Sequence, residues 1–379
     1  MPESFVLSPA DRAVDELIAI LRRRSYTVIG PRLRDGAIVL EEVSSASSLP
    51  IGWSDEQDAA TYRVNRRDDR SLFGYAVGPQ SPRRYLSPPR KTLWSAVRTD
   101  RGFEIDDAAA IAPPAYAFLG VRACELAAIS VQDKVLRDGP HPDPAYVQAR
   151  QQAFFVGVNC SHAVATCFCS SMGTGPKVDN GHDLAVTELL SDGAHELLIE
   201  SGSDRGADVL AELQSLVRWR RTTDDDLDAA REIVTATTVK MTRRLDPQAA
   251  RDVLISNLEH PRWNDVAQRC LSCTNCTLVC PTCFCSAVED VGSLDGDHTE
   301  RVQRWDSCFT LGHSQLHGAG SVRGDTRSRY RQWLTHKLST WWDQFDVSGC
   351  VGCGRCIAWC PAAIDLTQEV AAIAGGTEP

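Results

Sequence analysis

The chain carries one cysteine pattern twice, and this repeat constrains the fold more than any other feature of the 379 residues. The first copy runs from Cys270 to Pro281 and the second from Cys350 to Pro361. Each copy reads C-x2-C-x2-C-x3-C-P. Three thiolates on one tight loop can face a single inorganic core, whereas the fourth thiolate, on the next turn, points away from it. If the two copies share their inorganic cores, the segment between them must leave the cluster region after the first copy and return to it at the second.

This spacing is that of two-cluster ferredoxins, in which the fourth cysteine of each run binds the other cluster. We therefore predict two crossed 4Fe–4S clusters. The first predicted ligand set is Cys270, Cys273, Cys276 and Cys360. The second predicted ligand set is Cys350, Cys353, Cys356 and Cys280. A pair of structural zinc sites is the alternative, but zinc would favour C-x2-C pairs, and the third cysteine and the C-P ending disfavour it.

Three glycines surround the second run, namely Gly349, Gly352 and Gly354. Glycine lets a backbone approach a neighbouring group closely. We expect these residues to let the loop donate amide N–H groups to the cluster sulfurs. Pro281 and Pro361 should end the loops by fixing φ.

Four cysteines in the N-terminal half could complete a third 4Fe–4S cluster: Cys124, Cys160, Cys167 and Cys169. The first two follow the apolar runs 115–121 and 153–159, which read as buried strands. They would emerge at one edge of a sheet, beside the loop that holds the other two. This spacing is no general signature, and buried free cysteines that pack as small apolar residues are the alternative.

Three cysteines remain, for which packing or cluster-shell roles are preferred: Cys283, Cys285 and Cys308. Because the tetrapeptide Cys-Phe-Cys-Ser occurs at both 167–170 and 283–286, an exchange of roles between some of them and the N-terminal set is the alternative. The chain has fifteen cysteines and a formal net charge of -10, which disfavours nucleic acid as a partner. The N-terminus lacks the features of a secretory signal, and no apolar stretch reaches the roughly 20 residues of a membrane span. We predict a cytoplasmic protein, whose reduced thiols bind metal rather than form disulfides.

The other patterns predict an α+β protein in three parts. Residues 1–225 form an α/β domain, 226–262 a helical linker, and 263–372 a two-cluster ferredoxin-like domain with a helical insertion at 287–345. Within the first part, apolar periodicity predicts a helix from Ser8 to Arg24. The remaining local expectations are a hairpin at Asp35-Gly36 and irregular structure over 44–90.

Weaker signals carry no function of their own. His313 and His317 are four residues apart, but packed histidines are the preferred interpretation because no acidic third ligand stands beside them. The basic segment 323–331 is interpreted as a solvated helix face, with a docking surface as the alternative. We find no flavin, nicotinamide or nucleotide site and no catalytic nucleophile with its base.

Five segments together resemble the iron–sulfur β subunit of cytoplasmic NAD(P)-linked NiFe hydrogenases, the sulfhydrogenases, whose relatives include the A subunit of anaerobic sulfite reductase. The segments are GVRACELAAI (120–129), VNCSHAVATCFCSSMGTGP (158–176), CPTCFCSAVEDV (280–291), RWDSCFTLGHSQLHG (304–318) and SGCVGCGRCIAWCPAAIDLTQE (348–369). The CFC and WDSC blocks are far more specific than the double ferredoxin run. Family members often have Pro-Cys-Asp where this chain has Ala123-Cys124-Glu125, and both versions keep the thiol and an acid.

The resemblance implies a complex with a NiFe large subunit, an iron–sulfur small subunit and a flavoprotein that binds NAD(P). This chain would relay electrons between the flavin subunit and the hydrogenase small subunit, without binding hydrogen or pyridine nucleotide itself. Two alternatives remain open. One is the equivalent subunit of an anaerobic sulfite or sulfur reductase, and the other is a zinc-stabilised structural or interaction protein.

Overall fold

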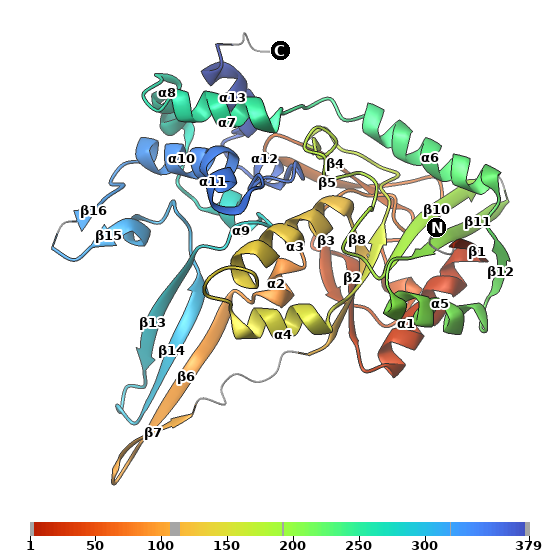
Figure 1. Cartoon of the computed structure of the whole chain (residues 1–379), viewed down its shortest axis with the longest axis horizontal. Helices are drawn as coiled ribbons and strands as arrows, with labels where there is room; N and C mark the ends of the chain where they lie inside the picture. The colour runs from red at the N-terminus through yellow and green to blue at the C-terminus, as the bar shows by residue number, and fades with distance from the viewer. Residues whose placement is uncertain (1–3, 107–113, 192, 319, 376–379) are drawn as a thin grey trace.

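The computed structural model describes residues 4–106, 114–191, 193–318 and 320–375, and its largest element is an eight-stranded sheet (Figure 1). The strands lie in the order β12-β1-β11-β10-β9-β8-β2-β3. The neighbours β10, β9, β8 and β2 are parallel, and the outer pairs are antiparallel. The bounds are β1 Ser4–Ser8, β2 Thr27–Arg34, β3 Ala37–Glu42, β8 Tyr116–Val121, β9 Phe154–Val158, β10 Leu184–Ser191, β11 Ala194–Ser201 and β12 Arg218–Arg221.

Helices cover both faces of this sheet because successive side chains of a strand point to opposite sides. Phe154 and Val156 of β9 belong to the core beneath one pair of helices, and Phe155 belongs to the core on the other side. The first pair is α1 (Ala10–Arg23) and α5 (Asp204–Gln214). The second pair is α3 (Ala123–Leu136) and α4 (Pro144–Gln152).

The predicted N-terminal helix is present as α1, but it begins at Ala10 rather than at Ser8. Ser8 ends β1, and Pro9 occupies the cap position without a side-chain hydrogen bond. The predicted hairpin is β2–β3, whose turn residues Asp35 and Gly36 have φ values of 49° and 74°. Positive φ at both central residues is the geometry that tight hairpins favour.

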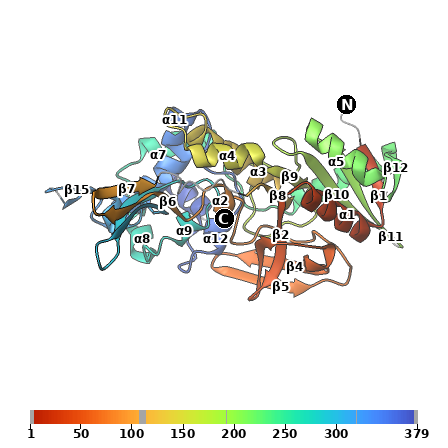
Figure 2. The same ribbon diagram turned by 90° about the horizontal axis from the view of Figure 1, so that it is seen from below.

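The stretch 44–90 was expected to be irregular, but it contains a hairpin of β4 (Trp53–Asp58) and β5 (Thr61–Arg66). The hairpin lies below the large sheet in the view of Figure 2. Its inward positions are polar, since Asp55 and Gln57 are buried. The apolar alternation that identifies a strand is therefore missing from the sequence. The short helix α2 (Arg83–Leu86) follows.

A four-stranded antiparallel sheet joins the two halves of the chain, in the order β13-β14-β6-β7. It extends from the body as an arm (Figure 1). Two strands come from the N-terminal half, β6 (Arg90–Thr99) and β7 (Gly102–Asp106). The other two open the predicted insertion, β13 (Ser286–Gly292) and β14 (His298–Trp305). The insertion therefore opens with two strands, and its α-helices begin at Thr326.

The C-terminal part is built from helices around the fully buried Trp263. The helices of this core are α7 Pro247–Ser256, α8 Arg262–Arg269, α9 Asn275–Leu278, α10 Thr326–Thr335, α12 Arg355–Ala358 and α13 Leu366–Ile373. Two further helices lie outside it: α6 (Asp224–Val239) contacts β10, and α11 (Trp341–Phe345) packs beside the N-terminal cysteines. A π-helical turn, His336–Thr340, joins α10 to α11. The predicted mixed α+β class is confirmed. No helix in the described ranges has the length and hydropathy needed to cross a membrane.

Candidate metal centre

The first predicted ligand set lines one cavity. Three of its cysteines belong to the first run and the fourth, Cys360, comes from the second run, so the structure brings together residues far apart in sequence. The short helices α9 and α12 hold the two runs side by side, and Asn275 Nδ2 donates to the Trp359 carbonyl oxygen at 3.2 Å. Burial, and then the neighbouring thiols Cys270 and Cys360, raise the pKa of Cys276 well above its ordinary value.

Two aromatic residues in the same cavity present hydrogen-bond donors without a partner. Tyr330 and Trp333 line the cavity, and the Tyr330 hydroxyl and the Trp333 indole nitrogen are buried. Among the described residues neither atom has a hydrogen-bond partner. An unsatisfied buried donor is costly, so these groups fit an acceptor inside the cavity, such as the sulfides of a cluster.

The second predicted set also lies together, around the junction of the two runs. Burial, followed by the thiols of Cys350, Cys280 and Cys353, raises the pKa of Cys356 well above its ordinary value. Burial likewise raises the pKa of Cys350 to about 12, although the cation of Lys337 acts against it. Burial therefore favours the protonated thiol at Cys350 and Cys356 until a metal ion displaces the proton.

Two buried cations border this second set, and sequence reasoning missed both. Lys337 is 3% exposed, and its ammonium lies 3.3 Å from Cys280 Sγ. Arg83 is 4% exposed and donates to the carbonyl oxygens of Thr277 and Cys280 at 3.3 and 3.0 Å. Its guanidinium stacks 3.6 Å from the ring centroid of Trp305.

The four N-terminal cysteines come together at one end of the large sheet. Cys124 is in the first turn of α3, directly after β8, and Cys160 follows the neighbouring parallel strand β9. Ligands commonly bind at the carboxyl ends of parallel strands. All four are buried, and burial followed by the thiols of Cys167 and Cys160 raises the pKa of Cys169. Cys353 of the second run packs in the same cluster of residues.

The glycines of the second run allow close approach to this N-terminal loop. A Cβ atom at Gly352 would lie 2.7 Å from the Cys169 backbone, and one at Gly354 would lie 2.3 Å from the Thr166 carbonyl oxygen. The close backbone approach expected of these glycines is therefore present, and it is made to the N-terminal loop. The Gly352 amide lies 3.5 Å from Cys350 Sγ, and the expectation that the glycines let amides donate to the cluster sulfurs stays a prediction.

The acid beside Cys124 neutralises a buried arginine of the second run. Arg355 is 1% exposed, and its guanidinium donates to Glu125 Oε1 at 2.5 Å. It also donates to the carbonyl oxygens of Gly78 and Gln80. The Cys-Glu pair in the N-terminal half and the Cys-Gly-Arg-Cys segment of the second run are thus coupled through one ion pair.

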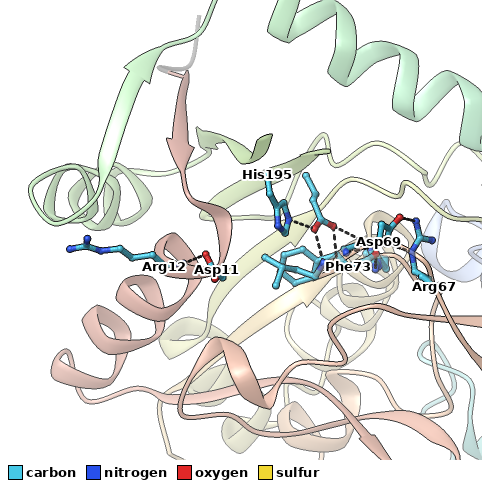
Figure 3. Close-up of polar contacts among 10 residues, drawn as sticks. Asp11, Arg12, Arg67, Asp69, Phe73 and His195 are labelled. Carbon is cyan, nitrogen blue, oxygen red and sulfur yellow. Dashed lines mark hydrogen bonds and ion pairs between the residues drawn. The ribbon is translucent and has the colours of Figure 1, made fainter. Parts of the chain in front are cut away.

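A buried carboxylate on β10 holds the segment that packs over the N-terminal cysteines, and two of its hydrogen-bond partners, Phe73 and His195, are labelled in Figure 3. Glu188 of β10 accepts from the Leu72 and Phe73 amides at 2.6 and 3.0 Å, and from Ser71 Oγ and His195 Nε2, both at 2.7 Å. The following residues Tyr75, Ala76 and Val77 are buried, and the last two pack against Cys124, Cys167 and Cys169. Glu188 therefore has a structural role.

The remaining cysteines lie near the two sets, Cys283 beside Cys280 of the second set and Cys308 near Cys276 of the first. Cys283 is buried, and its hydrogen bond with Cys280, followed by burial, raises its pKa well above the ordinary value, although the cation of Lys337 acts against this. Cys285 and Cys308 are neighbours, and a hydrogen bond from Cys308 lowers the pKa of Cys285 to about 6. The shell role expected for the three agrees with this placement and stays a prediction.

The histidine pair and the basic segment 323–331, the weaker signals of the sequence, show ordinary polar contacts. His313 Nδ1 is 2.5 Å from Asp306 Oδ2. Arg327 and Arg331 of the basic segment form ion pairs with Glu259, each at 2.8 Å. Within the described ranges, no three His, Cys, Asp or Glu side chains lie close enough together to hold one metal ion.

Comparison with known proteins agrees with the double cysteine run. A family model described as a 4Fe-4S dicluster domain matches residues 269–364. The C-terminal part is therefore a 4Fe–4S dicluster domain, and the chain is an iron–sulfur electron-transfer protein. The predicted cofactor is confirmed.

A relative that aligns with most of the chain identifies its family within this class. The chain is 31% identical over 309 residues to sulfhydrogenase 2 subunit beta of Pyrococcus furiosus, and the alignment covers 81% of this chain and 87% of that protein. The chain belongs to the family of sulfhydrogenase β subunits. The family resemblance inferred from the five sequence segments is confirmed.

Proposed function

We propose that this chain relays electrons through its 4Fe–4S clusters between a flavin subunit that binds NAD(P) and the small subunit of a NiFe hydrogenase. Membership of the sulfhydrogenase β family supports a role in a multi-subunit hydrogenase complex. A hydride carries two electrons and each cluster transfers one, so a series of clusters beside a flavin links the two chemistries. The single observation that carries the proposal is that cysteines of both runs line one cavity.

The proposed ligands are the two crossed sets, with Cys270, Cys273, Cys276 and Cys360 in the first and Cys350, Cys353, Cys356 and Cys280 in the second. When bound, the clusters supply one-electron redox chemistry at thiolate-ligated iron. The chain's own residues bury Cys280 and Cys353, offer donors from Tyr330 and Trp333, and place cations beside the second set. These groups control solvent access and local charge, on which reduction potentials depend.

We also propose a third cluster on Cys124, Cys160, Cys167 and Cys169. Their burial at one sheet end, close to Cys353, supports it. Anaerobic iron analysis is expected to give about twelve irons per chain, from three clusters of four. About eight irons would remove the third cluster, and zinc in place of iron in the native protein would overturn the whole assignment.

Purification of the native assembly under anaerobic conditions tests the partners. We expect a NiFe large subunit, an iron–sulfur small subunit and a flavoprotein to co-purify with the chain. A sirohaem subunit in their place would assign the chain to a sulfite reductase instead. Its absence together with the absence of any hydrogenase subunit would contradict the proposal.

A further inference from the structure

The ammonium group of Lys337 is buried and uses all three of its donors. It lies in the π-helical turn between α10 and α11, a kind of local distortion that is frequent at functional sites. Its Nζ donates to the Gly349 carbonyl oxygen at 3.0 Å, to Thr282 Oγ1 at 3.0 Å and to Cys280 Sγ at 3.3 Å. The Gly349 amide returns a hydrogen bond to the Lys337 carbonyl oxygen at 2.8 Å.

These contacts place the charge where the two cysteine runs meet. Cys280 ends the first run, and Gly349 directly precedes Cys350, the first cysteine of the second run. Both cysteines belong to the second proposed ligand set. Lys337 therefore touches the two segments that supply that set, whereas the cavity of the first set is lined in the described ranges by no lysine or arginine.

The charge also needs an anion. Among the described residues no Asp or Glu carboxylate forms an ion pair with Lys337 or with its neighbour Arg83. A buried cation without a partner costs several kcal/mol. Thiolates around an iron–sulfur core carry net negative charge, so the second set supplies the missing partner.

We propose that Lys337 raises the reduction potential of the cluster on the second set above that of the cluster on the first set. The inference rests on the ligand sets proposed above. A fixed positive charge favours the more negative, reduced state, and it acts strongly where water is excluded. An electron that reaches the pair therefore rests mainly at the second set. The step moves one electron from the first set to the second, and no bond or proton is transferred.

Redox titration of the full-length chain, purified anaerobically and followed by electron paramagnetic resonance, tests this. Signals are assigned to the two sets with Cys270→Ala and Cys350→Ala. Lys337→Met should change the equilibrium distribution of one electron between the two clusters by at least about tenfold in favour of the first set. This corresponds to a change of about 59 mV in the difference between their potentials for a one-electron couple. Lys337→Arg keeps the charge and should retain most of the wild-type difference.

Lys177→Met is the matched control, because it removes the same charge from a side chain that is 59% exposed and paired with Asp179. It should leave both potentials unchanged. If Lys337→Met loses iron, Lys337→Gln, which keeps a donor without the charge, is titrated in its place. Both cluster signals present with an unchanged potential difference in the neutral variants would overturn the role of Lys337. Failure of the ligand sets would appear separately, as the loss of no cluster or of the wrong cluster in the cysteine variants.

Discussion

The two cysteine runs have the same spacing but lie in different surroundings. The first run is near the surface, with Cys273 exposed, and its left-handed positions are filled by Ser272 and Thr274 at φ values of 49° and 70°. The corresponding positions of the second run are Gly352 and Gly354, at 64° and 75°. The first cavity is bordered by neutral aromatic donors, whereas the second set is bordered by buried cations.

This difference separates two kinds of information. The spacing of the thiols specifies the inorganic group, because it determines how sulfurs surround iron. The surroundings determine its solvent exposure and charge, and these come from residues outside the motif. Two copies of one motif can therefore hold the same cluster type and still differ in potential and in the partner they can reach.

The largest effect is expected from Cys360→Ala, which tests whether the runs are crossed. The variant should lose the first cluster, with about four irons, although Cys360 is in the second run. The second cluster should remain visible by anaerobic electron paramagnetic resonance. Loss of the second cluster with retention of the first would contradict the crossed ligand sets.

Substitutions at the two equivalent left-handed positions, one in each run, should change the stability of the protein by different amounts. Gly352→Ala forces a Cβ atom against the Cys169 backbone and should cost at least about 3 kcal/mol. Ser272→Gly should change stability by less than about 1 kcal/mol, since relief of the left-handed strain is offset by the entropy of glycine. Anaerobic thermal unfolding with iron analysis measures both. Equal shifts in Tm would show that the two loops are equally constrained.

The smallest effect is expected from Tyr330→Phe, which removes one neutral donor from the first cavity. The potential of the first cluster should fall by less than tenfold, below about 59 mV, and the second should stay unchanged. Potentiometric titration checks this. A fall larger than that caused by Lys337→Met at the second cluster would invert the proposed ranking of neutral donors and charge.

The sequence predicted those elements whose signals come from residues that are close together along the chain. The periodicity of Val14, Leu17, Ile18 and Leu21 specified α1 because these residues form its buried face. The arm was missed because β13 is exposed throughout and β14 pairs with the distant strand β6. Its strands therefore carry no apolar alternation and no short-range turn to β6.

The site divides in the same way. The two crossed cysteine sets could be predicted from spacing, since three cysteines of each of these sets are within one run. Lys337 had no such signal, because its partner Cys280 is 57 residues away in sequence. The Glu125–Arg355 pair spans 230 residues, and neither residue type is unusual in its own segment. Buried charges that meet through tertiary contacts become visible only in the folded chain.

The shared arm has a consequence for anyone who divides this protein. A fragment that starts near Trp263 would keep β13 and β14 but lose β6, and the edge of β14 would then expose unpaired amide and carbonyl groups. Such an edge readily recruits a strand from another molecule. The dicluster half produced alone is therefore expected to self-associate, and co-expression with residues 1–225 should restore a monodisperse product.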